Sequence, residues 1–334
     1  MKRIIDATEK DRKAIFSTAA AQAHIPAEMI EKDFWVCWTL KKLFSNPDLD
    51  KMLRFKGGTS LAKVFHLIQR FSEDLDLILD WRCVTEDNPL DARSNSKQDA
   101  FNKNIQEISG EYIAGPLSKL ISNAMGPECS VTPDPRDSHV LLIGYPESFT
   151  KSYITPNVRL EIGPLASWVP NGRFAIQSYV AETFPELEMQ PFTVPTILAE
   201  RTFWEKVTIL HQEHHRPEHL AVPLRYSRHY YDLFMMSKSG FLHKALSNKS
   251  LLKAVVDFKK KFYPRGWARY DLAVPGTLCL LPAQHSMKVL HDDYKAMRTM
   301  IFGDYPDWDD ICSTFADLEQ KINQNGDIAS GTIH

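Results

Sequence analysis

The segment from Phe55 to Leu77 constrains the fold more than any other part of the chain. Its first half reads Phe-Lys-Gly-Gly-Thr-Ser-Leu-Ala-Lys, and its second half ends in Arg-Phe-Ser-Glu-Asp-Leu-Asp-Leu. This pattern predicts a strand, a glycine turn, a helix capped by Thr59 or Ser60, and a second strand over residues 74–79. Such an order predicts a sheet with helices packed on it, because each strand has an apolar face to bury.

Two polar features of this segment predict a site for a metal-bound nucleoside triphosphate. Gly57 and Gly58 allow the backbone to approach a ligand closely, and the free N–H groups of the helix start suit a phosphate. Asp74 and Asp76 are two residues apart, so both carboxylates lie on one face of the second strand. Paired carboxylates repel unless a cation lies between them, and Mg²⁺ accepts carboxylate and triphosphate oxygens together. Taken singly, each feature is also typical of an ordinary turn or a solvated strand edge.

The composition fits a globular protein of the reducing cytosol. The 334 residues suffice for two domains, and 40 Lys and Arg against 42 Asp and Glu give a net charge of −2. This balance does not advertise nucleic-acid binding, so such contact would need a local basic patch. The five cysteines form no C-x-x-C pair, and no run approaches the roughly 20 apolar residues of a membrane helix. We therefore expect a cytoplasmic protein with no membrane segment.

Hydrophobic spacing predicts further elements on both sides of the glycine turn. Helices are expected over residues 7–23 and 27–44, and strands over residues 140–145 and 157–163. In the last of these strands Glu161 alternates with apolar residues. Glu161 would therefore join the paired aspartates if the two strands are neighbours, and an ion pair with Arg159 is the alternative.

Three prolines predict a connection between two domains, and Thr196 is expected to cap the helix that follows them. These prolines are Pro185, Pro191 and Pro195. The expected parts are a core domain with N-terminal helices over residues 1–190, a helical domain that completes the active-site cleft over 191–325, and a flexible tail over 326–334.

Two charged motifs lie in the predicted helical domain. Lys206, after Glu205, would bind a phosphate as a point charge, although a surface helix with ion pairs is the plainer interpretation. Residues 225–232 read Arg-Tyr-Ser-Arg-His-Tyr-Tyr-Asp and mix cations with aromatic rings. In the functional interpretation Arg228 contacts a nucleotide or RNA and Asp232 points into the site. A helical ion pair between these two residues, four positions apart, is the alternative.

A histidine cluster follows the first of these motifs. It consists of His211, His214, His215 and His219. The first and third are four residues apart, as zinc ligands on a helix would be, but no H-E-x-x-H occurs and Pro217 follows closely. The pattern therefore favours a solvated loop.

Together these motifs resemble the nucleotidyltransferase-like toxins of bacterial type IV toxin–antitoxin systems, the AbiEii/AbiGii family. The resemblance runs from Glu-Lys-Asp-Phe-Trp at residues 31–35 to Asp232, and it is strongest over the glycine turn and the paired aspartates. It implies an α+β fold, in which a polymerase-β-like nucleotidyltransferase core has a mixed sheet flanked by helices and a C-terminal helical domain follows. The histidine-rich insertion loosens the match at Asp232.

The resemblance also implies roles for particular residues. The catalytic set would be Asp74, Asp76, Lys206 and Asp232. The nucleotide-binding set would be Gly57, Gly58, Thr59, Ser60, Lys63 and Arg228. Asp74 and Asp76 would bind Mg²⁺, and strand alternation alone adds Glu161 as a third ligand.

The implied activity is Mg²⁺-dependent transfer of NMP from an NTP to an RNA acceptor, such as the 3′ end of tRNA. Growth or phage propagation would be inhibited as a result. The family is encoded beside a DNA-binding antitoxin, which would be the protein partner. Two alternatives stay open: a catalytically inactive protein that binds a nucleotide or an antitoxin, and a nucleotidyltransferase that modifies a protein or a small molecule.

Overall fold

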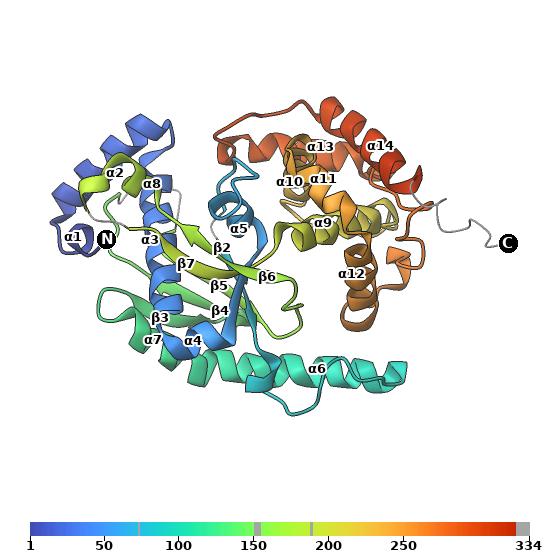
Figure 1. The fold of residues 1–334 in the computed structure, drawn as a ribbon, viewed down its shortest axis with the longest axis horizontal. Coiled ribbons are helices and arrows are strands. Elements are labelled where there is room, and N and C mark those ends of the chain that lie inside the picture. The colour runs from blue at the N-terminus through green and yellow to red at the C-terminus, as the bar shows by residue number, and fades with distance from the viewer. Residues whose placement is uncertain (73, 150–154, 188–189, 325–334) are drawn as a thin grey trace. The chain divides into compact units, whose positions relative to one another are not determined.

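The computed structural model describes residues 1–72, 74–149, 155–187 and 190–324 (Figure 1). The chain divides into two compact units. The first unit holds residues 1–65 and 71–197, and the second holds residues 66–70 and the chain from Leu198 onward. The tail predicted to be flexible lies outside the described residues.

The first unit is built on a seven-stranded sheet in the order β3-β4-β5-β2-β1-β7-β6. The strands are β1 (Leu53–Lys56), β2 (Asp74–Leu79), β3 (Ser130–Asp134), β4 (Asp137–Gly144), β5 (Asn157–Gly163), β6 (Asn171–Ile176) and β7 (Phe192–Ile197). The β2–β5 and β1–β7 pairs are parallel, and the other neighbours are antiparallel. This mixed sheet, flanked by helices, confirms the predicted α+β class.

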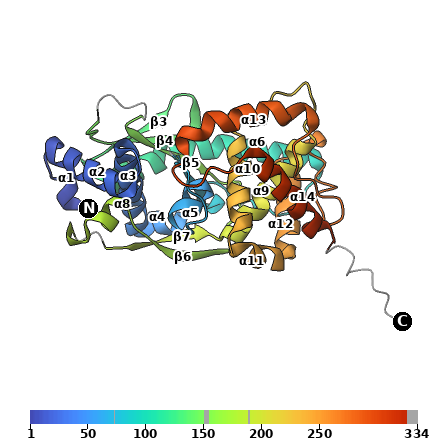
Figure 2. The same ribbon diagram turned by 90° about the horizontal axis from the view of Figure 1, so that it is seen from above.

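Helices of the first unit pack against this sheet and against one another. They are α1 (Lys2–Ile5), α2 (Glu9–Ala23), α3 (Ala27–Ser45), α4 (Pro47–Met52), α5 (Gly57–Lys63), α6 (Asn95–Tyr112), α7 (Ser118–Met125) and α8 (Tyr179–Thr183). Helix α3 packs on β5 and β7, α5 packs on β1 and β2, and α6 and α7 contact β4 and β3. Helices α2 and α8 lie beside α3 (Figure 2).

Helix α3 is unusual because charged as well as apolar residues are buried on it. Glu31 accepts a backbone N–H, and Lys32 donates to backbone carbonyls, all from the chain between β4 and the start of β5. Asp33 accepts the backbone N–H of Tyr179 at 2.9 Å and pairs with Lys63 at 2.7 Å. Each buried charge therefore anchors a neighbouring segment to α3, which satisfies the requirement that buried polar groups find partners.

The strand that carries the paired aspartates has the predicted bounds. Leu75 and Leu77 are buried, while Asp74 and Asp76 on the alternate positions are half-buried. In the parallel ladder with β5, Asp76 lies opposite Glu161. The prediction that both aspartates share a face is thus confirmed, and the condition for Glu161 to join them is met.

The start of helix α5 differs from the prediction. The helix begins at Gly57 after Lys56, so Thr59 and Ser60 lie inside it and the predicted cap is wrong. Gly57 has a φ of +80°, a conformation that favours glycine. The turn is therefore completed at the first glycine, two residues before the hydroxyl side chains.

The proline-rich connection contains a strand that sequence reasoning did not predict. Pro195 lies within β7, and the hydroxyl of Thr196 donates to the carbonyl of Val194 at 3.2 Å. The next helix starts at Ala199 after Leu198, so the predicted cap at Thr196 is wrong. A proline is compatible with β7 because its ladder with β1 is short.

The second unit is helical. Its helices are α9 (Ala199–His214), α10 (Ser227–Lys238), α11 (Phe241–Ser247), α12 (Lys249–Phe262), α13 (Met287–Ala296) and α14 (Trp308–Gln324). Helix α9 packs against α10, α11 and α12, and α10 also contacts α13 and α14. Aromatic rings of Tyr230, Trp308 and Phe315 meet in this core. Of the helices that the structure describes, none is both long and apolar enough to cross a membrane.

The first two histidines of the cluster, His211 and His214, lie on α9 rather than in a solvated loop, so the prediction is wrong for these two. His211 is fully buried; its Nε2 donates to the carbonyl of Arg269 at 2.9 Å, and its Nδ1 accepts the N–H of Cys279 at 3.1 Å. Burial lowers the pKa of His211 to about 4. Because both ring nitrogens have backbone partners, His211 serves packing rather than metal binding.

Candidate functional site

The glycine turn and the paired aspartates meet in the structure. A Cβ atom added to Gly57 would lie 1.9 Å from Oδ2 of Asp76. The side chain of Asp76 therefore lies directly against the backbone of the turn, and no residue other than glycine fits there without rearrangement. Since Gly57 also has a positive φ, two independent constraints require glycine at this position.

The hydroxyl groups predicted to bind nucleotide have backbone partners in the structure. Thr59 Oγ1 donates to the carbonyl of Asp74 at 2.6 Å, and Ser60 Oγ donates to the carbonyl of Gly57 at 2.8 Å. The first bond ties α5 to the start of β2. Both hydroxyl oxygens keep acceptor capacity, but their protons are committed to the backbone.

Lys63 points into the packing between α5 and α3. Its ammonium pairs with Asp33 at 2.7 Å and lies 3.9 Å from the centre of the Tyr179 ring. Burial opposes the charge on Lys63, but Asp33 outweighs it and raises the pKa of Lys63. This geometry does not support the predicted nucleotide contact, because the charge is already neutralised inside the unit.

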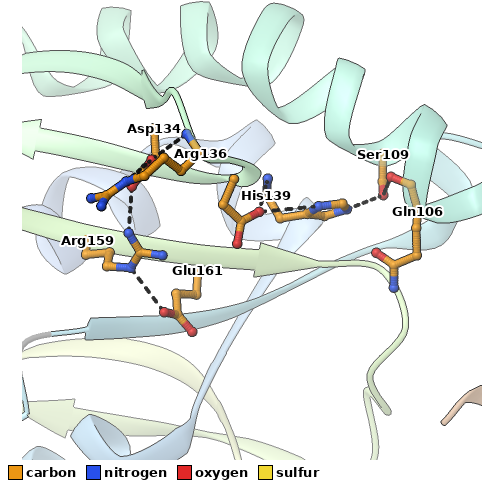
Figure 3. Close-up of polar contacts among 8 residues, drawn as sticks. Gln106, Ser109, Asp134, Arg136, His139, Arg159 and Glu161 are labelled. Atoms are coloured by element: carbon orange, nitrogen blue, oxygen red, sulfur yellow. Dashed lines mark hydrogen bonds and ion pairs between the residues drawn. The ribbon is translucent and has the colours of Figure 1, made fainter. Parts of the chain in front are cut away.

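A single arginine links the carboxylates of β2 and β5. Nε of Arg159 lies 3.1 Å from Glu161, and its Nη1 lies 2.7 Å from Asp134 (Figure 3). The same Nε lies 4.0 Å from Asp74. The parallel ladder places Arg159 opposite Asp74, so the contact follows from the strand register. Glu161 therefore has the ion pair that its spacing from Arg159 suggested.

The same network continues to the edge of the sheet. Asp134 is buried and accepts the backbone N–H of Arg136 at 2.8 Å. That N–H and the Arg159 guanidinium together lower the pKa of Asp134. On neighbouring β4, His139 Nε2 lies 3.0 Å from Ser109 Oγ of α6 (Figure 3). Ser109 is buried and also donates to a backbone carbonyl of α6. Its contact with His139 therefore joins α6 to the sheet.

The carboxylates of Asp74 and Asp76 on one face of β2 fit a divalent cation that is bound together with a substrate. Across the described parts of the chain, no group of three or more His, Cys, Asp or Glu side chains could hold a metal ion. Asp74 and Asp76 remain as a pair of half-exposed carboxylates on one strand face. Mg²⁺ is commonly held by one or two carboxylates, with substrate phosphates completing its shell. The pair suits that arrangement and not a cage made by protein alone.

The second unit brings together two other predicted residues, Lys206 and Asp232, and adds Arg70. Arg70 Nε donates to Asp232 Oδ1 at 2.6 Å, and its Nη2 donates to Oδ2 at 2.8 Å. Lys206 Nζ donates to Asp232 Oδ2 at 2.7 Å. All three side chains are buried, and Asp232 is 0% exposed. The predicted alternative for Asp232, a helical ion pair with Arg228, is replaced by this cluster.

The charges of Arg70, Lys206 and Asp232 do not cancel one another. Burial opposes the charge on Asp232, but Arg70 and Lys206 outweigh it and hold the pKa of Asp232 far below its ordinary value. Burial lowers the pKa of Lys206 against the attraction of Asp232, and Arg70 and Arg228 lower it further. Two buried cations thus share one carboxylate, and a third cation, Arg228, lies close enough to act on Lys206.

Sequence reasoning gave no role to Arg70, and it noted Arg159 only as a possible partner of Glu161. Arg70 lies four residues before Asp74 inside the strongest motif, and that position was its only signal. Two backbone contacts also hold the segment around Arg70 within the helical unit. The carbonyl of Gln69 accepts the N–H of Phe302 at 3.1 Å, and Arg70 forms an isolated β-bridge with Ile301.

Comparison with known proteins places the chain in a family. No curated protein matches the sequence significantly. Among solved structures, it is similar to MenT4, a nucleotidyltransferase toxin from Mycobacterium tuberculosis H37Rv, with 18% identity and a TM-score of 0.42 over 93% of this chain and 97% of that chain. The family model for the nucleotidyl transferase AbiEii toxin of type IV toxin–antitoxin systems matches residues 38–318, which confirms the resemblance found in the motifs. The chain therefore belongs to the AbiEii nucleotidyltransferase toxins of type IV toxin–antitoxin systems.

Proposed function

We propose that the protein transfers a nucleoside monophosphate from an NTP to a hydroxyl group of an RNA acceptor, such as the 3′ end of tRNA. The observation that carries the proposal is the contact between the turn at Gly57 and the carboxylate of Asp76. It joins backbone that suits a phosphate to carboxylates that suit a phosphate-bound cation. Membership of a nucleotidyltransferase toxin family supports the same reaction class.

In this proposal Asp74 and Asp76 hold Mg²⁺, which supplies positive charge to the triphosphate when bound. Backbone N–H groups at the start of α5, from Gly57 and Gly58 to Thr59 and Ser60, would contact the phosphates. The acceptor oxygen forms a bond to the α-phosphorus, the bond to the β-phosphate oxygen breaks, and pyrophosphate leaves. The acceptor proton passes to a carboxylate of the face or to water. Positioning and electrostatics carry most of such a reaction.

The helical unit carries two cations with predicted roles. Lys206 and Arg228 are the candidate phosphate ligands, as the motifs predicted. Asp232 is better assigned to holding Lys206 and Arg70 than to binding metal, because its two carboxylate oxygens already accept hydrogen bonds from these two cations. The proposed partners are an NTP, an RNA and a DNA-binding antitoxin. We place the activity in the cytoplasm, with inhibition of growth or of phage propagation as its consequence.

The test is nucleotide incorporation with purified protein. The full chain is incubated with each α-labelled NTP, Mg²⁺ and total cellular RNA, and labelled RNA is resolved on a gel. Asp74→Asn and Asp76→Asn should each lower incorporation by at least about a hundredfold. Asp99→Asn, an exposed aspartate on α6 with the same charge change, is the matched control and should retain activity.

Three results would contradict the proposal. Full incorporation by both variants would exclude Asp74 and Asp76 from the reaction. Label found on protein and not on RNA would exclude the RNA acceptor. NTP binding without any incorporation would favour the inactive, nucleotide-binding alternative.

A further inference from the structure

We propose that Arg159 sets the affinity of the Asp74–Asp76 face for a divalent cation, because it is a built-in positive charge that competes with that cation. This inference rests on the proposed function, in which the two aspartates hold Mg²⁺. It also gives Glu161 a different task from the predicted one: Glu161 holds Arg159 instead of binding the metal.

The strand register places Arg159 where a competing cation must be. In the parallel β2–β5 ladder, Arg159 lies opposite Asp74 and Glu161 lies opposite Asp76. The guanidinium reaches three carboxylates, at 2.7 Å for Asp134, 3.1 Å for Glu161 and 4.0 Å for Asp74. The backbone pairing thus places the Arg159 side chain on the same strand face as Asp74, with its guanidinium in reach of that carboxylate.

Asp134 anchors the other end of the guanidinium. Its side chain is 4% exposed, and it also accepts the backbone N–H of Arg136. Asp134 is buried and is held in place by a backbone N–H, so its ion pair fixes the orientation of the Arg159 guanidinium (Figure 3). Arg136 belongs to the same network, yet its side chain is 90% exposed and lies 3.8 Å from Asp134.

The sign of the expected effect follows from Coulomb's law. A unit positive charge about 4 Å from Asp74 repels a divalent ion that approaches the same carboxylate, and the half-buried setting limits screening. Neutralising Arg159 should therefore tighten cation binding, and charges at this range commonly change affinity by about tenfold or more. A residue with a purely structural role would instead weaken binding when removed.

The experiment measures Mn²⁺ binding to the full chain without nucleotide, using the EPR signal of free Mn²⁺. Asp74→Asn should lose the binding and so identifies the site. Arg159→Gln should bind Mn²⁺ about tenfold more tightly, whereas Arg159→Lys, which keeps the charge, should stay within about threefold of the unchanged protein. Arg136→Gln is the matched control and should not change the affinity.

A second pair of variants guards against a folding defect. Arg159→Gln alone leaves the buried Asp134 without its guanidinium partner, so Asp134→Asn/Arg159→Gln removes both members of the pair. The double variant should also bind Mn²⁺ more tightly, while Asp134→Asn alone keeps the Arg159 charge and should show no gain.

Different results would contradict the role of Arg159 and the assignment of the metal site. If Arg159→Gln and the double variant both bind Mn²⁺ as well as or less tightly than the unchanged protein, while Asp74→Asn loses it, the role of Arg159 is wrong and the metal site stands. If Asp74→Asn keeps full Mn²⁺ binding, the metal assignment of the proposed function is itself wrong.

Discussion

The two predicted groups of charged residues use aspartate in opposite ways. Asp74 is 31% exposed, shares its strand face with other carboxylates and has Arg159 at 4.0 Å. Asp232 is completely buried and has two dedicated cations, Arg70 and Lys206, at 2.6 and 2.7 Å. In one environment several carboxylates share the guanidinium of Arg159, and in the other two cations share one carboxylate.

This difference teaches which carboxylate is available for chemistry. A half-exposed carboxylate beside others gains from a cation that arrives from solution. A buried carboxylate with three charge-assisted hydrogen bonds has no free proton-accepting role, because its protonation would leave two buried cations without their counter-charge. We therefore expect Asp74 to matter for activity and Asp232 to matter for stability and for the placement of Lys206.

The largest expected effect on stability tests this contrast at Asp232. Asp232→Asn leaves Arg70 and Lys206 buried with a neutral partner, and breaking a buried pair in this way costs about 3–5 kcal/mol. Guanidinium chloride unfolding followed by tryptophan fluorescence measures the loss. The matched control is Asp292→Asn, an exposed aspartate on α13. An unfolding midpoint equal to that of the unchanged protein would remove the distinction between the two aspartates.

A smaller effect is expected at the turn beneath the carboxylate face. Gly57→Ala forces a side chain into a φ of +80° and against Asp76, which should cost about 2 kcal/mol of unfolding free energy and also displace that carboxylate. Gly163→Ala, at the end of neighbouring β5 with no atom within 4 Å of the added Cβ, is the control. Equal stability of the two variants would show that the turn tolerates a side chain.

Mild acid should destabilise the helical unit, because His211 is buried there. The pKa of His211 is lowered to about 4 in the folded protein, against about 6.5 in an unfolded chain. Between these values the unfolded state binds the extra proton, so stability falls as the pH falls from about 6.5 to 4, by about 3 kcal/mol.

Thermal unfolding at several pH values measures this dependence. His211→Gln should unfold at a lower temperature at neutral pH but lose part of the slope between pH 6.5 and 4. His243→Gln, an exposed histidine on α11, should keep the slope. An unchanged slope in His211→Gln would assign the acid sensitivity to another group.

The smallest expected effect on stability is at Asp74. Asp74→Asn removes a charge from a crowded, half-exposed carboxylate face, so the free energy of unfolding should change by no more than about 0.5 kcal/mol, while nucleotide incorporation is lost. Denaturant unfolding and the incorporation assay are performed on the same preparation. A loss of stability similar to that of Asp232→Asn would mean that Asp74 is also an anchor.

Predictions from the sequence were correct where the structure depends on residues that are close together in the chain. Strands β2 and β5 have the predicted bounds because strict alternation of apolar and polar residues reports a half-buried strand directly. Predictions from capping preference failed at α5 and α9, where glycine backbone or a preceding strand set the start of the helix. Strand β7 was missed because prolines indicated a connection, although the sheet accommodates one there.

The α+β class, the family and the paired aspartates could be predicted from the sequence, because they depend on motifs whose members lie close together in the chain. Only the tertiary structure decided what each charge does. Arg70 and Asp232 are 162 residues apart, and Arg159 reaches Asp74 and Asp134 on two other strands. Ion pairs of this kind depend on which strands and helices become neighbours, so spacing along the chain does not reveal them. The same applies to Gly57, whose requirement comes from the approach of Asp76 as well as from the turn.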